Sequence, residues 1–323
     1  MNILVSIAEA TMNDRITRVM LVMFISFITA AAVLGASVSS AWAQTANPLP
    51  ADHPEVTVHG RKFTPRSILA RNMGTPEDQT TQFPPHKIIG NLYYVGTRTL
   101  SSFLIVTPQG NILINSTYER NVQTIQKSVE QLGFKFSDIK ILLGTHAHND
   151  HQEGDALVKE MTGAQTMAMA EDVPALQAMK PGGKEHPIDK TLHDGEMVTL
   201  GGTTLTAHLT PGHTRGCTTW TMKAQDGGKM YDVVIGCSLR PPATLTPEVV
   251  AEFSHTFPLV RSLACDVPLG DHPAQYNMRE KYAKLQEGAR NPFIDRAGCK
   301  YEVDIEEAMF HALLDEQRQA AGH

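Results

Sequence analysis

Residues 144–154 read GTHAHNDHQEG and place four residues of metal-binding types within six positions: His146, His148, Asp150 and His151. The apolar run 139–143, which has the composition of a buried strand, leads directly into this segment, and a run with helical spacing follows it. In open α/β sheets, ligands gather at the carboxyl ends of the strands. The segment therefore predicts an α/β fold that carries a metal site at a strand end.

The rest of the chain alternates between strand and helix patterns. We expect strands over 88–97, 102–107, 111–115, 166–170 and 265–269, and hairpins over 197–209 and 218–235. We expect helices over 67–72, 119–132, 173–179, 247–263, 274–287 and 305–319, and one that ends at Gly163. Residues 44–85 otherwise look irregular. Two mixed β-sheets packed face to face, with helices on their outer faces, would bury these strands, so we predict one α/β domain over residues 44–323.

The first 43 residues differ from the rest. Arg15 and Arg18 precede an apolar run over 19–35, and residues 41–43 read AWA, a small-x-small pattern of the kind that signal peptidase cuts. The alternative is a membrane anchor, because the run is borderline in length for a span. It lacks a basic flank on its far side, so we expect a secretory signal peptide over 1–43, a periplasmic location and no stable membrane anchor after cleavage.

Composition narrows the class of partner. Hydrophobic residues make up 41% of the chain, enough for a globular core, and 28 Lys and Arg against 34 Asp and Glu give a net charge of −6. Because the sequence contains no run of basic residues, nucleic acid is not an expected partner. We expect a monomer that acts on a small molecule.

All four cysteines lie in the exported part of the chain: Cys217, Cys237, Cys265 and Cys299. An even number in an oxidising compartment favours disulfides over buried free thiols, and four cysteines allow three pairings. We expect the sequence neighbours to pair. None of the four has the spacing of a zinc knuckle.

An ion at the 144–154 segment needs three or four ligands, so others must come from elsewhere in the chain. His213, in TPGHT, and His272, in GDHP, each follow an expected strand in a loop that contains Gly and Pro. A lone loop histidine is usually a surface residue, and we assign that role to five others: His53, His86, His186, His255 and His311. We therefore add only His213 and His272 to the predicted site.

These motifs together resemble the signature of the metallo-β-lactamase superfamily: HxHxDH after a strand, a later Pro-Gly-His-Thr, and a last histidine in a Gly-x-His-Pro loop. The segments TPGHTRGCTTW, LACDVPLGDHP and NPFIDRAG are similar to the third subclass of the class B, metal-dependent, β-lactamases. The resemblance covers about residues 88–317. It implies a four-layer αβ/βα sandwich.

The resemblance also implies a site with two Zn²⁺ ions per chain. The first ion would be held by His146, His148 and His213. The second would be held by Asp150, His151 and His272. Cys237 would be a disulfide partner of Cys217, whereas other β-lactamase subclasses use a cysteine as a ligand of the second zinc. Ser238 would contact the substrate.

The activity implied is hydrolysis of β-lactams: penicillins, cephalosporins and carbapenems. Zinc lowers the pKa of a bound water to about 7, so a hydroxide can attack the lactam carbonyl without a covalent enzyme intermediate. Asp150 would hold that hydroxide in line. A serine β-lactamase is not expected because only the SDIK tetrapeptide at 137–140 fits its motifs.

The main alternative functions belong to enzymes that share this fold. Glyoxalase-II-type thioesterases, lactonases and phosphodiesterases of the superfamily place a bridging aspartate near the end of the strand after the Pro-Gly-His loop, but residues 235–240 read IGCSLR. A non-catalytic relative is the other alternative, and the intact set of six ligands argues against it.

Two features depart from the family pattern, the loop after Ser238 and the residue at position 115. The loop after Ser238 is short, RPPATLTP over 240–247, and lacks the Asn-Pro-x-Tyr-Pro element of most relatives. Arg240 in this loop is either a partner for the β-lactam carboxylate or a solvent-facing side chain. Asn115 stands where an aspartate is common, which would loosen the groups that orient the metal ligands.

Overall fold

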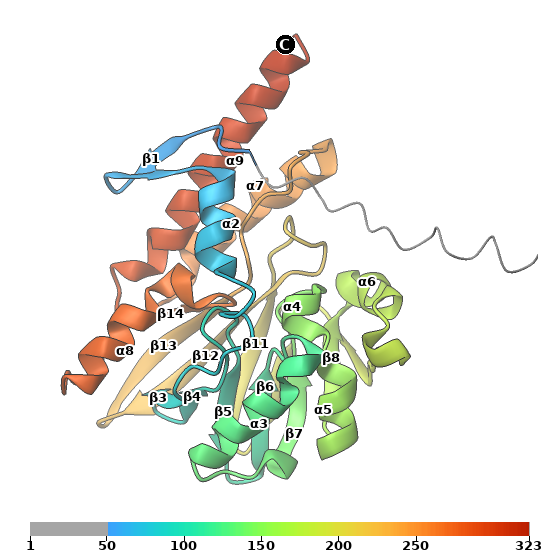
Figure 1. The fold of residues 1–323 in the computed structure, drawn as a ribbon, viewed down its shortest axis with the longest axis vertical. Helices are drawn as coiled ribbons and strands as arrows, with labels where there is room; N and C mark the ends of the chain where they lie inside the picture. Colours follow the sequence, from blue (N-terminus) through green and yellow to red (C-terminus); the bar gives the residue numbers. More distant parts are fainter. Residues whose placement is uncertain (1–50, 323) are drawn as a thin grey trace, which may run out of the picture. The chain divides into compact units, whose positions relative to one another are not determined.

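The computed structural model describes residues 51–322, and these contain two mixed β-sheets packed face to face (Figure 1). The seven-stranded sheet has the order β3 (His86–Ile89), β4 (Leu92–Tyr94), β5 (Phe103–Thr107), β6 (Gly110–Ile114), β7 (Ile139–Leu143), β8 (Gln165–Met169) and β9 (Lys190–Leu192). Neighbours from β3 to β6 are antiparallel, and those from β6 to β9 are parallel.

The five-stranded sheet in the same residues has the order β10 (Met197–Leu200), β11 (Thr203–Leu209), β12 (Thr218–Asp226), β13 (Lys229–Gly236) and β14 (Val267–Gly270). Its neighbours are antiparallel, except that β14 runs parallel to β13. Gly236 pairs with Gly270, so the segments that follow β13 and β14 begin side by side.

Helices cover the outer faces (Figure 1). On the side of the seven-stranded sheet lie α3 (Val122–Gln131), α4 (Asn149–Gln152), α5 (Asp155–Thr162) and α6 (Val173–Ala178). On the other side lie α7 (Pro247–Ser262), α8 (Met278–Gln286) and α9 (Tyr301–Ala320). Short 3₁₀ helices span Glu119–Asn121, Phe136–Asp138, Ala170–Asp172, Pro181–Gly183, Pro273–Tyr276 and Gly298–Lys300. This arrangement confirms the predicted fold.

The main core lies between the two sheets, and strand alternation explains how it forms. On β5, Phe103 and Ile105 point into the space between the sheets, where Trp220 of β12 packs, whereas Leu104 points outward to meet Ile125 of α3. A sheet with apolar residues on both faces needs a second layer on each side. The predicted four layers follow from this pattern.

Several predicted element boundaries are wrong. The expected strand over 88–97 is two strands, because Gly90, with φ of 55°, and Asn91 form a two-residue turn between them. The helix expected over 274–287 is interrupted at Asn277, whose φ of 53° is left-handed and ends the 3₁₀ turn before α8. The short strand β9 was not predicted.

The segment expected to be irregular contains a hairpin of β1 (Val56–Val58) and β2 (Arg61–Phe63), followed by α2 (Pro65–Met73) where a helix was expected. His59 and Gly60 both have positive φ, 50° and 72°, as a type I′ turn requires. Phe63 and Ile68 pack against Ile305 of α9. The hairpin is therefore part of the folded unit.

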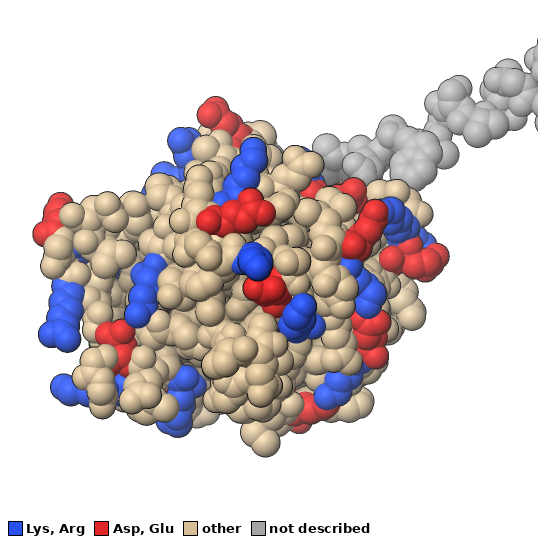
Figure 2. All heavy atoms as spheres, turned by 90° about the horizontal axis from the view of Figure 1, so that it is seen from below, with Lys and Arg blue, Asp and Glu red and all other residues tan. Residues whose placement is uncertain are grey.

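The predicted signal peptide over 1–43 lies outside the described residues. Within residues 51–322, no helix is both long and apolar enough to cross a bilayer. On the face shown in Figure 2, acidic and basic side chains are interspersed and no continuous basic area is seen.

Candidate metal centre

The segment that follows β7 turns into α4 beside the strands of the second sheet. Gly144 begins this turn, and a Cβ there would lie 2.1 Å from the Gln152 carboxamide, so only glycine fits without displacing it. The carbonyl of Gly144 accepts a 3.0 Å bond from Trp220 Nε1, and that of Thr145 accepts a 2.7 Å bond from Thr218 N. The two sheets therefore fix the position of the histidine segment jointly.

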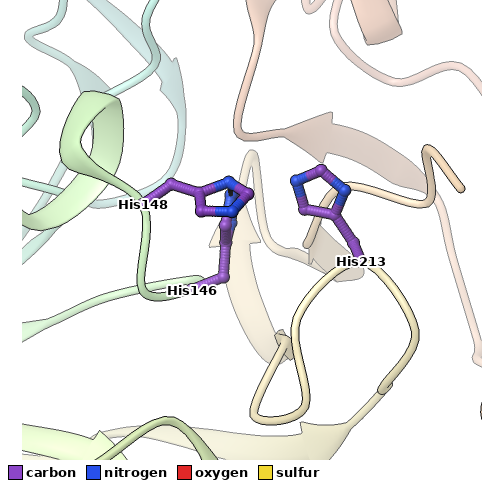
Figure 3. Close-up of side chains that lie close together, drawn as sticks. All are labelled: His146, His148 and His213. Atoms are coloured by element: carbon purple, nitrogen blue, oxygen red, sulfur yellow. Dashed lines mark hydrogen bonds between the residues drawn. The ribbon is translucent and has the colours of Figure 1, made fainter. Parts of the chain in front are cut away.

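Three imidazoles from two loops face one another and form the first of two sets of candidate metal ligands (Figure 3). His146 and His148 come from the segment after β7, and His213 comes from the loop after β11; their ring centroids are 4.7–4.8 Å apart. Nε2 of His146 lies 3.0 Å from Nδ1 of His148. His213 Nδ1 donates to the Arg240 carbonyl at 2.8 Å, which leaves Nε2 with a free lone pair. His148 and His213 are partly exposed, so this set is open to solvent.

A second set lies next to the first. The Asp150 carboxylate lies 3.2 Å from His151 Nε2 and 3.8 Å from His272 Nε2. His272 Nδ1 donates to the Thr99 carbonyl at 3.0 Å. Both ring nitrogens of His151 are buried, and neither has a hydrogen-bond partner among the described residues. A bound cation would satisfy His151, so these residues fit a metal ion.

The two sets form a double site. Within each set, one ligand atom per residue lies within 4.8 Å of the others. The rings of His146 and His151, one from each set, have centroids 4.2 Å apart. Imidazole and carboxylate groups at this spacing are the donors that Zn²⁺ takes in hydrolases. The structure thus brings together all six residues that the sequence singled out as ligands.

Burial keeps most of these rings in the state that binds metal. Burial, and then repulsion from the other histidines, holds the pKa of His146 and of His213 well below the usual value. Burial likewise lowers the pKa of His148 and His272. For His151 burial acts in the same direction, but the neighbouring Asp150 carboxylate outweighs it and raises the pKa. Neutral imidazoles offer a lone pair to a cation, and Asp150 supplies a negative charge.

Comparisons with known proteins agree with this geometry. Residues 95–225 match the family described as the Metallo-beta-lactamase superfamily. The FEZ-1 metallo-β-lactamase from Legionella gormanii is 46% identical, with a TM-score of 0.70 over 74% of this chain and 98% of that chain. The chain belongs to the metallo-β-lactamase superfamily. BJP-1, a subclass B3 metallo-β-lactamase of Bradyrhizobium japonicum, is 36% identical, with a TM-score of 0.70 over 76% of this chain and 98% of that one.

Among the curated relatives of this chain, another enzymatic activity is found. A hydroxyacylglutathione hydrolase from Methylobacterium nodulans is 28% identical over 157 residues, which are 47% of this chain and 52% of that protein. The chain therefore spans only about half the length of this curated relative. All of these relatives are hydrolases of the metallo-β-lactamase superfamily that act on small molecules.

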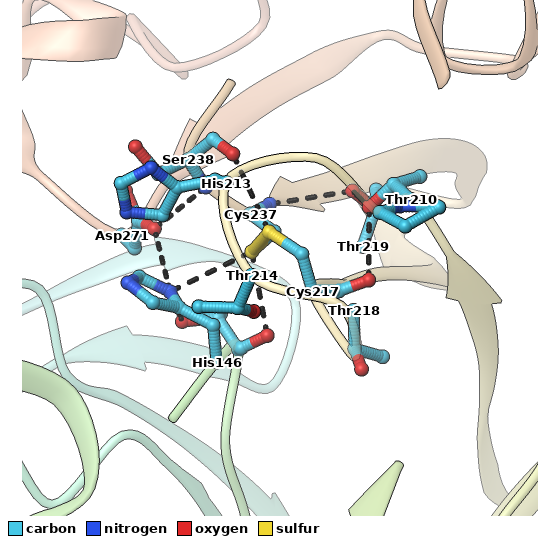
Figure 4. The surroundings of a disulfide bond; sticks show 12 residues. His146, Thr210, His213, Thr214, Cys217, Thr218, Thr219, Cys237, Ser238 and Asp271 are labelled. Carbon is cyan, nitrogen blue, oxygen red and sulfur yellow. Dashed lines mark hydrogen bonds and ion pairs between the residues drawn. A yellow bond between two sulfur atoms is a disulfide. The ribbon is translucent and has the colours of Figure 1, made fainter. Parts of the chain in front are cut away.

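The cysteines of this hydrolase pair as expected: Cys217 with Cys237 and Cys265 with Cys299. The first disulfide lies beside His146, with Cys237 Sγ 3.5 Å from Nδ1 of that ring (Figure 4). All four cysteines are in disulfides. Cys237 therefore has no thiolate to offer a metal ion, as the resemblance implied.

Sequence reasoning missed a buried carboxylate that joins the two histidine loops. Asp172, at the end of a 3₁₀ helix, accepts bonds from Ala147 N at 2.8 Å and Thr214 Oγ1 at 2.9 Å with one oxygen, and from Gly216 N at 2.7 Å with the other. It therefore clamps the loop of His146 to the loop of His213. No local pattern marks this role.

The residues predicted to contact the substrate or to orient the ligands lie close to the metal centre. Ser238 is 3% exposed, and its backbone N–H donates to Asp271 at 2.7 Å. Arg240 is partly exposed and lies near the first set, where its charge helps to lower the pKa of His148 and His213. Asn115, buried with φ of 64°, accepts bonds from Thr145 N and Oγ1 at 2.9 and 3.2 Å. Asn115 therefore contributes hydrogen bonds, but no charge, to the histidine segment.

Two histidines assigned to the surface are buried. His86 stacks on Tyr94 and Phe293 and donates from Nδ1 to the Pro84 carbonyl at 2.8 Å. His186 lies 3.4 Å from the Asp155 carboxylate. Their surroundings come from distant parts of the chain, which is why the surface assignment was wrong.

Proposed function

We propose that this hydrolase is a dizinc β-lactamase of the subclass B3 type. The observation that carries the proposal is the complete double set of six ligands, in a chain that matches 98% of a metallo-β-lactamase at 46% identity. The first zinc would be held by His146, His148 and His213. The second would be held by Asp150, His151 and His272.

Bound zinc would supply two functions, a water molecule acidified to a pKa of about 7 and a Lewis acid for the carbonyl oxygen. The residues of the chain prepare the site for both. The carbonyls of Arg240 and Thr99 fix the tautomers of His213 and His272 so that Nε2 faces inward. Asp150, which is 15% exposed, is the carboxylate that orients the attacking water from the side of the second set.

Substrate would enter where the first set is exposed. Arg240 is partly exposed at this edge, and a guanidinium there suits the carboxylate that β-lactams carry beside the ring nitrogen. Ser238 precedes it by two residues, is 3% exposed, and would contact the substrate as the family resemblance implies.

A thioester hydrolase is the second candidate, and the similarity to hydroxyacylglutathione hydrolases favours it. The segment after β13 argues the other way. Residues 235–240 contain no aspartate, although the thioesterase pattern would place a bridging aspartate in this stretch, and Cys237 within it is held in a disulfide. Asp271, a further carboxylate beside the histidines, faces Nδ1 of His146, whereas Nε2 of that ring faces the first set.

The deciding experiment assays purified zinc-loaded protein against a carbapenem, a cephalosporin, a glutathione thioester and a lactone, with and without a chelator. We expect chelator-sensitive hydrolysis of at least one β-lactam. Turnover of the thioester or lactone without any β-lactam hydrolysis would overturn the proposal, as would β-lactam turnover that a chelator leaves unchanged. The variant His213→Ala should lose activity, whereas His208→Ala, at a histidine of β11 whose ring bonds to Thr221, should keep it.

We also propose that the protein acts in the periplasm after removal of residues 1–43. Two disulfides are consistent with an oxidising compartment outside the cytoplasm. Intact mass of protein isolated from the periplasmic fraction tests this, and a full-length mass or recovery only in the cytoplasm would contradict it.

A further inference from the structure

A buried carboxylate outside the two ligand sets lies against the first of them. Asp271 follows β14 directly, is 0% exposed, and precedes His272. Its backbone carbonyl accepts a 2.9 Å bond from Ser101 N, which ties it to the loop that also holds His272. A fully buried Asp is rare unless it is paired, so its partners indicate what it does.

One oxygen of Asp271 makes two contacts toward the metal centre. Oδ2 accepts a 2.7 Å bond from Ser238 N and lies 3.3 Å from Nδ1 of His146 (Figure 4). The other oxygen, Oδ1, is buried and has no hydrogen-bond partner within residues 51–322. The carboxylate therefore joins a first-set ring to the segment that follows β13.

The contact between Asp271 and His146 selects the tautomer of the His146 ring. A neutral imidazole carries one N–H, and a carboxylate beside Nδ1 favours the proton there, which leaves the lone pair of Nε2 directed at the first set. The other neighbours of Nδ1 are Thr145 Oγ1 at 3.2 Å and a disulfide sulfur at 3.5 Å, and neither is charged. Asp271 is thus the carboxylate that can make this ring a stronger donor to a metal.

The contact with Ser238 extends this effect to a second ligand. Two residues later, the Arg240 carbonyl accepts the Nδ1 proton of His213. Holding Ser238 in place therefore helps to hold the acceptor that orients His213. Asn115 brings no charge to this region, so its hydrogen bonds do not replace the carboxylate.

We infer that Asp271 is a positioning residue that orients His146, and through Ser238 the Arg240 carbonyl, for the first metal ion. The inference rests on the proposed dizinc function. Within residues 51–322 the buried Asp271 carboxylate forms no ion pair with a lysine or arginine, so a bound metal would compensate it, and it should raise metal affinity more than it raises the stability of the metal-free protein.

The test uses Asp271→Asn, which has nearly the same shape. Its amide oxygen can replace Oδ2 and its NH₂ can take the place of the unpartnered Oδ1, so the variant removes the charge and keeps the contacts. We expect about 10- to 100-fold weaker binding of the more accessible zinc ion in competition with a chromophoric chelator. In histidine-labelled, zinc-loaded protein, the N–H signal of the ring that donates to Asp271 should shift upfield.

The matched control is Asp155→Asn. Asp155 is also 0% exposed and also lies beside a histidine, His186, but it touches no proposed ligand. Wild-type zinc affinity in Asp271→Asn, or an equal loss in both variants, would overturn the inference. Zinc affinity is measured without substrate, so a wild-type protein that binds two zinc ions and hydrolyses no β-lactam would contradict the proposed function alone.

Discussion

Removal of either disulfide should destabilise the protein by a similar amount, but only removal of Cys217–Cys237 should weaken metal binding. The perturbations are two double variants, Cys217→Ala with Cys237→Ala, and Cys265→Ala with Cys299→Ala. The sequence separations are 20 and 34 residues. Loop-closure entropy then gives about 3.3 and about 3.8 kcal/mol at 25 °C, a difference of only about 0.5 kcal/mol.

Burial of the cysteines changes the difference in stability between the two variants slightly. Cys217 and Cys237 are 0% and 4% exposed, so their truncation also leaves a small cavity, worth about 1 kcal/mol. The two variants should therefore lose nearly the same free energy of unfolding. Their surroundings differ much more, because Cys237 Sγ lies 3.5 Å from His146 Nδ1, whereas Cys299 Sγ lies 3.7 Å from the Asp295 carbonyl.

Two measurements separate the effects. Urea unfolding in the presence of a chelator should show losses of about 3–5 kcal/mol for both variants. Zinc titration should show weaker binding in the Cys217/Cys237 variant and wild-type binding in the other. Equal zinc affinity in the two variants would refute the reasoning that the first disulfide supports His146.

Three further predictions concern single residues. Asp172→Ala should cost about 2–6 kcal/mol in urea unfolding, because it leaves two buried backbone N–H groups without acceptors; a loss below about 1 kcal/mol would contradict this. Burial, and then a neighbouring carboxylate, raises the pKa of Glu306 to about 8 from an ordinary 4.5. The folded state therefore keeps a proton that the unfolded state releases, so this group stabilises the fold below about pH 4.5 and loses that contribution as the pH rises to about 8. Glu306→Gln should flatten the fall in stability of metal-free protein over that range, and an unchanged pH slope would argue against the assignment. Arg240→Ala should raise KM for a β-lactam about 10-fold with little change in kcat, whereas Arg215→Ala, whose side chain is 83% exposed, should behave as wild type; equal KM values would remove Arg240 from the substrate site.

The sequence predicted the two sheets better than the ends of the individual elements. Alternation on β5 and helical spacing on α3 are local, so they are visible in a single chain. Gly90 and Asn277 changed the expected elements because each adopts a positive φ that hydrophobic periodicity does not report. The His59-Gly60 turn was a usable signal for the first hairpin, since such a pair fits a type I′ turn.

The sequence by itself pointed to the six candidate ligands of this protein. These six candidates lie in the segments that follow three strands, and such segments gather at one edge once the sheets form; the four cysteines and the apolar alternation agree with such a fold. Only the tertiary structure decided what supports those ligands. Asp172 and Asp271 act on residues 25 to 125 positions away, Ala147 and His146, and the Thr99 carbonyl holds a histidine 173 residues away. Such contacts depend on how the two sheets pack against each other, and no spacing along the chain encodes them.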